Sequence, residues 1–293
     1  MTNGSRSDIV VVIGAGAMGA ACARRLGPGY QVLLADNNAD RLSAVTDEMR
    51  TDGFDVRTAL VDVTDRDSIA QLAGGVQGAG RLKTLVHTAG VSEGMGQAET
   101  IFAVDTLGVV NVLDCFEPVL SPGTVGIFII SMAADLLSLR PTPGWTDELE
   151  KRIIASPPRE LLALLTSVLP ENHRFVYWQA KRAARLRVHA AAHAWTAHGA
   201  RLMTISPGVI STAMTAMELP RVPEMRRFIE LAGRIGTVED IANAAQFLAS
   251  DLGSFLNGSD LLLDGGTIAA LRAEIAINQT GNAQSLAGTQ TAP

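Results

Sequence analysis

Cysteine, long apolar runs and positive net charge are all scarce in this chain of 293 residues. The two cysteines, Cys22 and Cys115, lie far apart without the spacing of a metal site, and we expect free thiols in a reducing compartment. No segment reaches the roughly 18 consecutive apolar residues of a membrane span. The net charge of −6 argues against a nucleic-acid-binding surface. The sequence therefore predicts a cytoplasmic protein with no membrane, nucleic-acid or metal partner.

Lysine and tyrosine are also rare, which makes one pair of them conspicuous. Of the 24 basic side chains three are lysines, and Lys181 follows Tyr177, one of two tyrosines, by four residues. The Ala-rich stretch 174–198 is typical of one helix, so the two side chains share a face. An ammonium lowers the pKa of a nearby phenol from about 10. Such a pair can exchange a proton with a substrate oxygen, although an isolated pair at this spacing is more often an ordinary surface feature.

A glycine-rich turn follows the first predicted strand. Residues 9–13 form a β-branched run typical of a strand buried on both faces. The turn has the spacing G-x-G-x-x-G and opens a helix, a context that predicts dinucleotide binding because its backbone N–H groups can approach a pyrophosphate. The alternative is a glycine turn without a ligand. Candidate cofactor-binding residues here are Gly14, Gly16, Ala17, Met18 and Gly19.

An acidic residue ends the second predicted strand. Asp36 can accept hydrogen bonds from both ribose hydroxyls of NAD and would repel the 2′-phosphate of NADP, so we expect NAD to be preferred. The alternative is that this carboxylate caps the helix predicted over 39–52. Strands and helices alternate along the rest of the chain, which specifies a doubly wound parallel α/β sheet with helices on both faces and ligands at the carboxyl ends of its strands.

In this order, the motifs resemble those of the short-chain dehydrogenase/reductase family. They are G-A-G-A-M-G at 14–19, D-V at 62–63, T-A-G at 88–90, Ser131, Y-x-x-x-K at 177–181, S-P-G-V-I-S-T at 206–212 and L-D-G-G at 263–266. The resemblance covers residues 8–272. It implies a Rossmann-type, seven-stranded parallel sheet that binds NAD(P).

The resemblance also implies roles for single residues. Tyr177 would be the acid/base, Ser131 would orient the substrate oxygen, and Lys181 would hold the nicotinamide ribose and lower the pKa of Tyr177. Further cofactor contacts would come from Asp62, Val63, Ala89, Gly90, Pro207, Gly208, Ile210 and Thr212.

Four features depart from the family pattern. The glycine loop is one residue shorter than usual. His87 stands where an amide side chain usually braces neighbouring strands, and we expect it to replace that amide. Asp105, on a helix predicted over 97–118, stands where an asparagine usually carries a proton relay; it is a candidate catalytic residue that would raise the pKa of the lysine.

The fourth departure is an insertion, because 46 residues separate Ser131 from Tyr177 where the family usually has far fewer. We expect helices near 146–155 and 158–168, and we expect 136–172 to cap a hydrophobic substrate. The alternative is a flap that contacts another subunit. Candidate lining residues are Leu136, Leu137, Leu139, Trp145 and Leu161–Leu165. Residues 213–233 are a second candidate cover.

Together these features predict one domain over 1–277 and a disordered tail over 278–293. The Ala-rich helix at 174–198 suggests subunit pairing, so we expect a homodimer or homotetramer. The predicted activity is hydride transfer between NAD(H) and a hydrophobic secondary alcohol or ketone, with Tyr177 as acid/base. The alternative is a catalytically silent NAD-binding sensor or scaffold of the same fold.

Overall fold

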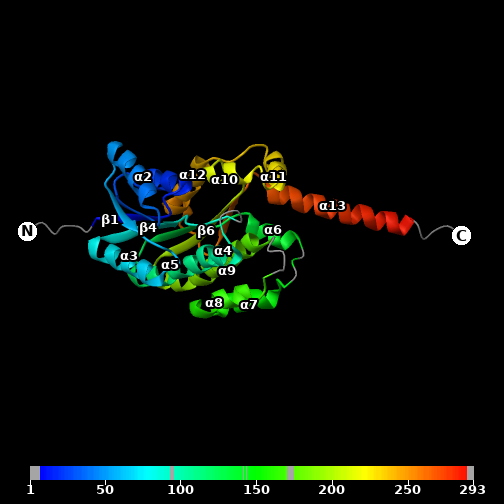
Figure 1. Cartoon of the computed structure of the whole chain (residues 1–293), viewed down its shortest axis with the longest axis horizontal. Coiled ribbons are helices and arrows are strands. Elements are labelled where there is room, and N and C mark those ends of the chain that lie inside the picture. The colour runs from blue at the N-terminus through cyan, green and yellow to red at the C-terminus, as the bar shows by residue number, and fades with distance from the viewer. Residues whose placement is uncertain (1–6, 93–95, 141, 143, 170–174, 289–293) are drawn as a thin grey trace, which may run out of the picture.

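The structure, a computed structural model, describes residues 7–92, 96–140, 142, 144–169 and 175–288, with side chains up to residue 279. Seven parallel strands form one sheet in the order β3-β2-β1-β4-β5-β6-β7 (Figure 1). The strands are β1 Asp8–Ile13, β2 Gln31–Asp36, β3 Val56–Leu60, β4 Arg81–His87, β5 Val125–Ile129, β6 Arg201–Pro207 and β7 Asp260–Leu263. This confirms the predicted doubly wound sheet, whose order reverses between β1 and β4.

Each face of the sheet is covered by three helices. Helices α1 (Ala17–Leu26), α2 (Ala39–Thr51) and α12 (Val238–Ala249) pack on one face, and α3 (Arg66–Ala79), α5 (Gly108–Phe116) and α9 (Val176–Ala197) pack on the other (Figure 1). Successive residues of β1 join the two cores alternately, since side chains of a strand point to opposite faces. The β-branched run at 9–13 is therefore buried on both sides, as predicted.

The remaining helices surround the carboxyl edge of the sheet and the outer side of α9. They are α4 Ala98–Phe102, α6 Ala133–Leu139, α7 Asp147–Ala155, α8 Pro158–Thr166, α10 Ala213–Glu218, α11 Glu224–Ala232 and α13 Thr267–Gly288. The two helices predicted in the insertion are confirmed as α7 and α8. None of the helices in the described part of the chain is long and apolar enough to cross a membrane.

Two expectations about helices were wrong. The helix predicted over 97–118 is divided, because a π-helical turn at Ala103–Leu107 separates α4 from α5. The tail predicted to be disordered from residue 278 instead continues α13 as far as Gly288, and this helix projects from the body of the molecule (Figure 1). Residues 289–293 lie outside the described part. The polar residues after 277 suggested disorder, but this stretch contains no proline that would end the helix.

Candidate active site

Contacts with neighbouring residues hold the glycine turn after β1 and leave the N-terminus of α1 accessible. Gly14 has φ +104°, a conformation that favours glycine, and a Cβ at Gly19 would collide with the carbonyl oxygen of Gly14. Thr88 donates a hydrogen bond to that carbonyl at 2.9 Å. Gly16, the N-cap of α1, faces open space, and the first turn of α1 carries no acidic residue. Ala17 and Met18 follow in that turn, so its residues fit the pyrophosphate of a dinucleotide.

Asp36 braces the glycine turn from the neighbouring strand. Its carboxylate accepts hydrogen bonds from the backbone N–H groups of Ala15 at 2.7 Å and Asn38 at 2.9 Å. Arg41 pairs with it at 3.2 Å. The alternative that Asp36 caps the next helix was wrong, because Asn38 is the residue that caps α2.

Other predicted cofactor residues lie at the ends of β3 and β4. Asp62 is exposed and accepts hydrogen bonds from both the backbone and the hydroxyl of Thr64. Val63 is buried, and its carbonyl accepts a hydrogen bond from Asn111 at 3.0 Å. Ala89, which precedes Gly90, donates its backbone N–H to the carbonyl of the last residue of β1. The structure thus places these residues on the carboxyl edge, as the alternation of elements predicted.

The turn after β6 carries the remaining predicted cofactor residues. Pro207 ends the strand, and Gly208 lies so close to β7 that a Cβ would sit 2.8 Å from the Cα of Asp264. Ile210 is buried and forms an isolated parallel bridge with Gly236. Thr212 caps α10. The turn is therefore fixed against two neighbouring segments.

Ser131 and Tyr177 meet although the insertion separates them. Ser131 follows β5, and its hydroxyl accepts a hydrogen bond from the backbone of Ala133 at 3.1 Å. Tyr177 is in the first turn of α9, close enough to Ser131 for a side-chain hydrogen bond from Ser131 to lower the pKa of Tyr177. Both residues line a cavity of about 600 Å³. Their convergence is the geometry that the family resemblance implies.

Lys181 and Asp105 form a buried ion pair beside the phenol. The Lys181 Nζ lies 3.5 Å from Asp105 Oδ1 and 5.5 Å from the centroid of the Tyr177 ring. The π-helical turn carries Asp105, whose Oδ1 also accepts the backbone N–H of Val91 at 2.9 Å. A Cβ at Gly90 would lie 2.9 Å from Asp105 Oδ1, so this glycine lets the pair reach the strand end. Asp105 Oδ2 has no hydrogen-bond partner among the described residues.

The charges and the burial around Tyr177 act in opposite directions on its pKa. Burial has the largest effect on the pKa of Tyr177 and raises it. Lys181 and the Ser131 hydrogen bond lower this pKa, whereas Asp105 and Glu218 raise it. The net direction is upward. Lys181 therefore lowers the pKa of Tyr177, as expected, but burial outweighs this effect and the pKa stays above its usual value. Loss of solvation outweighs an ammonium whose charge is partly compensated by Asp105. Burial lowers the pKa of Lys181, but Asp105 and Tyr177 raise it above its usual value, so the ammonium is retained.

Two family models match most of the folded chain. The model described as short chain dehydrogenase matches residues 8–139, and the model described as Enoyl-(Acyl carrier protein) reductase matches residues 162–267. A short-chain dehydrogenase/reductase of Alternaria brassicicola, bsc3, is 32% identical over 268 residues, which cover 89% of this chain and 96% of that protein. The chain belongs to the short-chain dehydrogenase/reductase family. The unmatched stretch, 140–161, contains most of the insertion.

Other members of the short-chain dehydrogenase/reductase family extend the comparison. The chain is similar to LinX of Sphingobium indicum, a 2,5-dichloro-2,5-cyclohexadiene-1,4-diol dehydrogenase, with 31% identity over 256 residues that cover 86% of this chain and 92% of LinX. It is 26% identical over 211 residues to the 3-alpha-hydroxysteroid dehydrogenase/carbonyl reductase of Comamonas testosteroni, covering 70% and 78% of the two chains. A solved short-chain type dehydrogenase/reductase from Mycobacterium ulcerans has the same fold, with a TM-score of 0.71, 23% identity and 90% of each chain covered.

His87, one of the departures from the short-chain dehydrogenase/reductase pattern, contacts the neighbouring strand β5 by ring stacking and not by a hydrogen bond. It is fully buried, and neither ring nitrogen has a hydrogen-bond partner in the described part of the chain. The ring instead stacks on Phe128 with centroids 5.3 Å apart. Burial and the Lys181 ammonium lower the pKa of His87 to about 3, so the ring is neutral. His87 therefore takes the place of the bracing amide by stacking, without the amide's hydrogen bonds.

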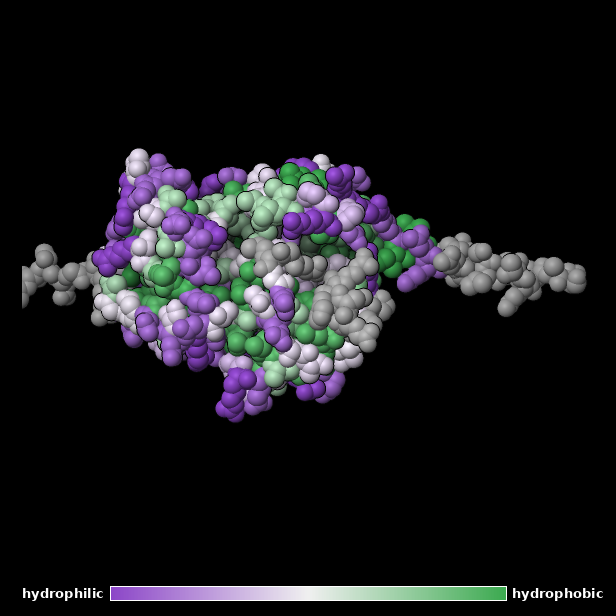
Figure 2. Space-filling view, in the orientation of Figure 1, coloured by the Kyte–Doolittle hydropathy of each residue, from purple (hydrophilic) through white to green (hydrophobic). Residues whose placement is uncertain are grey.

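Most of the described part of the insertion lies away from the cavity beside Tyr177. Leu136 lines that cavity, but Leu161 and its neighbours on α8 pack in a core with Phe102 and Val176, on the outer side of α9. The cover comes instead from α10, α11 and the turn before them. A hollow opens beneath these two helices on the face shown in Figure 2. Apolar side chains that line the cavity are Met132, Leu136, Phe175, Trp178, Val209, Met214, Val222, Met225 and Phe228.

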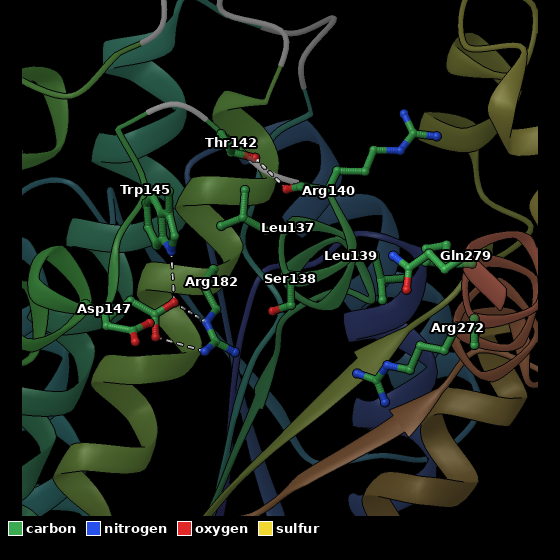
Figure 3. A pocket seen from close by; sticks show the side chains of 13 residues that line it. Leu137, Ser138, Leu139, Arg140, Thr142, Trp145, Asp147, Arg182, Arg272 and Gln279 are labelled. Carbon is green, nitrogen blue, oxygen red and sulfur yellow. Dashed lines mark hydrogen bonds and ion pairs between the residues drawn. The ribbon is translucent and has the colours of Figure 1, made fainter. Parts of the chain in front are cut away.

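The other predicted cap residues border a second cavity. This cavity has a volume of about 690 Å³ and lies among α6, α7, α9 and α13 (Figure 3). Leu137, Leu139 and Trp145 line it together with several charged side chains. Trp145 donates its indole N–H to Glu150, which also pairs with Arg182 (Figure 3). These residues therefore join the insertion to α9 instead of covering Tyr177.

Glu218 and Arg185 are site residues that the motifs did not reveal. Glu218, on α10, lines the cavity and acts on the pKa of Tyr177. Arg185 lies eight residues after Tyr177, so the helical period places it on the same face. The helical period could therefore have indicated Arg185 from the sequence, whereas no motif near Glu218 indicates its role. The histidines of α9 form no metal site in the described residues, and His189 instead contacts Thr204 at 3.0 Å.

Proposed function

We propose that the chain is an NAD(H)-dependent oxidoreductase that interconverts a hydrophobic secondary alcohol and its ketone. The convergence of Ser131 and Tyr177 at the wall of one largely apolar cavity is the observation that carries the proposal. Two hydroxyl donors that converge on one point suit a single substrate oxygen on which charge develops. Membership of the family supports the class of reaction, and the apolar lining supports the substrate class.

The nicotinamide, when bound, donates or accepts the hydride. In the direction of reduction, Ser131 donates a hydrogen bond to the carbonyl oxygen of the substrate, and Tyr177 gives that oxygen its proton. Lys181 stabilises the phenolate that remains, and Asp105 keeps the ammonium charged and in place. In the direction of oxidation, the Tyr177 phenolate takes the proton of the alcohol. The raised pKa of Tyr177 favours reduction near neutral pH and oxidation at alkaline pH.

The proposed cofactor is NAD(H), with NADP(H) bound more weakly. Asp36 ends β2 beside the glycine turn, where the adenosine ribose of a dinucleotide would lie in this fold. Its carboxylate would accept hydrogen bonds from ribose hydroxyls and repel a 2′-phosphate. Arg41, the nearest cation, already pairs with Asp36. We expect NADH to bind at least about tenfold more tightly than NADPH, because juxtaposed like charges weaken binding and about 1.4 kcal/mol corresponds to a tenfold change.

Cyclic substrates deserve priority in a search, because LinX and the hydroxysteroid dehydrogenase are both named for cyclic alcohols. Secondary alcohols with NAD or NADP, and ketones with NADH or NADPH, would be screened by the change in nicotinamide absorbance. The proposal predicts turnover of apolar cyclic compounds with NAD(H). Cofactor binding without turnover of any compound would contradict it and favour the silent sensor instead.

We also propose that the chain acts as a homodimer or homotetramer. Several small side chains of α9, which suggested subunit pairing, are buried inside the chain, where α9 packs against α4, α6 and α7. Support comes instead from β7, which is an edge strand, and from the neighbouring Leu252 and Phe255, which are 83% and fully exposed. An apolar surface beside an open edge favours association. Light scattering of the intact chain tests this, and a monomer at micromolar concentration would contradict it.

A further inference from the structure

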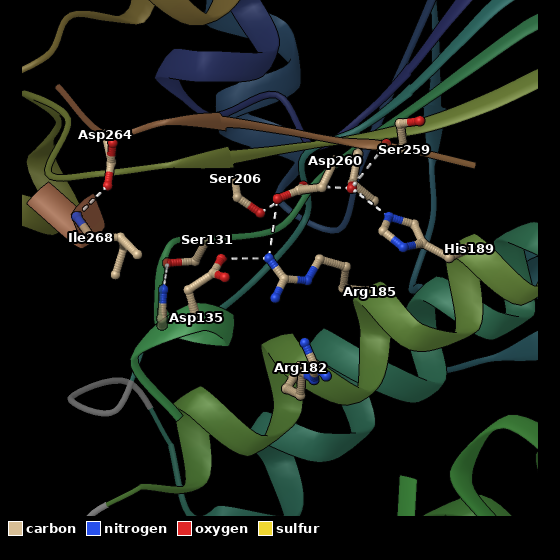
Figure 4. A network of polar contacts seen from close by, with 12 residues as sticks. Ser131, Asp135, Arg182, Arg185, His189, Ser206, Ser259, Asp260, Asp264 and Ile268 are labelled. Carbon is tan, nitrogen blue, oxygen red and sulfur yellow. Dashed lines mark hydrogen bonds and ion pairs between the residues drawn. The ribbon is translucent and has the colours of Figure 1, made fainter. Parts of the chain in front are cut away.

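Arg185 is a buried cation that the proposed reaction does not use. It lies one helical turn beyond Lys181 and two beyond Tyr177 on α9, and it is only 6% exposed. Its guanidinium donates hydrogen bonds to Asp135 at 2.6 Å and to Asp260 at 3.1 Å (Figure 4). A buried guanidinium is costly unless carboxylates surround it. Arg185 therefore joins three segments that are distant in sequence.

The two carboxylates belong to segments that shape the active site. Asp135 is in the first turn of α6, four residues after Ser131, and it also pairs with Arg272 at 3.3 Å. Asp260 begins β7 and accepts hydrogen bonds from Thr204 and Ser206 of β6 (Figure 4). The network thus ties the turn that carries Ser131 to the helix that carries Tyr177, with the β6–β7 pair as its base.

Backbone hydrogen bonds hold the Ser131 turn on one side, where it faces β6. Ile130 and Met132 donate their N–H groups to β6, at Ile205 and Pro207. Among the described residues, the ion pair that joins this turn to the tyrosine helix runs from Asp135 to Arg185. Arg140, at the end of α6, also contacts α9 through the ring of Trp178. Both hydrogen bonds come from Nη1 of Arg185, so a single nitrogen of the guanidinium serves the two carboxylates.

We propose that Arg185 is a positioning residue, which holds Ser131 against Tyr177 through its ion pair with Asp135. The inference rests on the proposed function, in which these two hydroxyls share the substrate oxygen. A shift of about 1 Å between reacting groups can cost about 100-fold in rate. Loss of the pair lets α6 move relative to α9 and weakens the hydrogen bond between Ser131 and Tyr177.

Asp135→Asn is the decisive variant, since it keeps the size of the side chain and leaves Arg185 paired with Asp260. The chain has two tyrosines, Tyr30 and Tyr177, so titration of tyrosinate absorbance against a Tyr177→Phe blank isolates Tyr177. The Ser131 hydrogen bond lowers the pKa of Tyr177, and we expect its weakening to raise that pKa by about one unit. Removing the charge of Asp135 would by itself act in the opposite direction, so an upward shift is diagnostic.

Arg182→Met is the matched control. Arg182 is the neighbouring arginine on α9 that pairs with Glu150 at 2.8 and 2.9 Å, but its pair leads to the insertion and not to Ser131. We expect Asp135→Asn to lower kcat about tenfold, with the Kd for NADH changed less than twofold and with the pH profile shifted upward. Arg182→Met should retain the wild-type pKa of Tyr177 and the wild-type pH profile. Lys181, Asp105 and Glu218, which also act on Tyr177, are unchanged in both variants.

Two results would overturn the inference. One is an unchanged or lowered pKa of Tyr177 in Asp135→Asn. The other is an equal upward shift in Arg182→Met, which would indicate general loosening of α9. The titration needs no substrate, so the inference is decided even if the screen for turnover fails. Failure of that screen with an upward shift in Asp135→Asn alone would refute the reaction and leave the positioning role standing.

Discussion

The charges around Tyr177 act on its pKa in opposite directions. Lys181 favours its phenolate, while Asp105 and Glu218 disfavour it, and loss of solvation tips the balance toward the neutral phenol. Asp105 keeps Lys181 as a full ammonium beside the ring. Its negative charge also offsets part of the effect of that ammonium on the pKa of Tyr177. At neutral pH the residue is therefore the protonated phenol, the form that can donate a proton.

Glu218→Gln tests this balance through the pH profile. Glu218 raises the pKa of Tyr177, so its neutralisation lowers that pKa. Oxidation of an alcohol needs the phenolate, so its rate rises with pH through this pKa, and the rising limb should move to lower pH. Reduction needs the phenol, and its falling limb should move in the same direction. Steady-state rates across pH measure both limbs.

Glu230→Gln on the exposed side of α11 serves as the control for Glu218→Gln and should leave the profile unchanged. A shift of equal size in both variants would mean that net charge, and not the position of Glu218, sets the pKa. An upward shift in Glu218→Gln would contradict the assigned sign.

The sequence predicted residues whose partners are close in the chain better than those whose partners are distant. The glycine turn and the pair of Tyr177 and Lys181 follow from local spacing. The pKa of Tyr177 does not, because it depends on burial and on Glu218, which is 41 residues away on a separate helix. Arg185 shares the helical period of the pair, but its role depends on Asp135 and Asp260, which only the fold brings together.

At the scale of elements, the insertion and the cover are separate parts. Helices α7 and α8 were predictable from capping residues and prolines, yet the side of α9 on which they pack was not. Their apolar face fits a core with Ile101, Phe102 and Val176, away from the cavity. Hydrophobicity alone cannot distinguish a face that packs on a helix from one that covers a ligand. The segment 213–233, a second candidate in the sequence, contributes α10 and α11 to the cavity.

Leu161→Ala and Met225→Ala separate these two parts. Leu161 of α8 is fully buried, so its truncation should lower the free energy of unfolding by about 2–5 kcal/mol with KM for the substrate unchanged. Met225 of α11 lines the cavity, and its truncation should raise KM about tenfold with a smaller loss of stability. Urea unfolding and steady-state kinetics measure the two effects. A raised KM in Leu161→Ala would restore the insertion as the substrate cap.

At the scale of the whole molecule, the site exists because parallel strands end at one edge. The turns after β1, β2, β4, β5 and β6 all open there, and α9 brings Tyr177 to the same place. The order of the strands could be predicted from the alternation of elements and from the family resemblance. The long final helix (Figure 1) could not, because the residues after 277 are polar and show no apolar periodicity.

Turnover by Tyr177→Phe, measured beside its affinity for NADH, tests the central claim most directly. The variant lacks the hydroxyl that exchanges the proton but keeps the ring and the cofactor-binding residues. Loss of general acid catalysis should lower kcat about 100- to 10,000-fold, with the Kd for NADH within about twofold of the wild type. Tyr30→Phe, at the other tyrosine, should be fully active. Wild-type turnover by Tyr177→Phe would contradict the account.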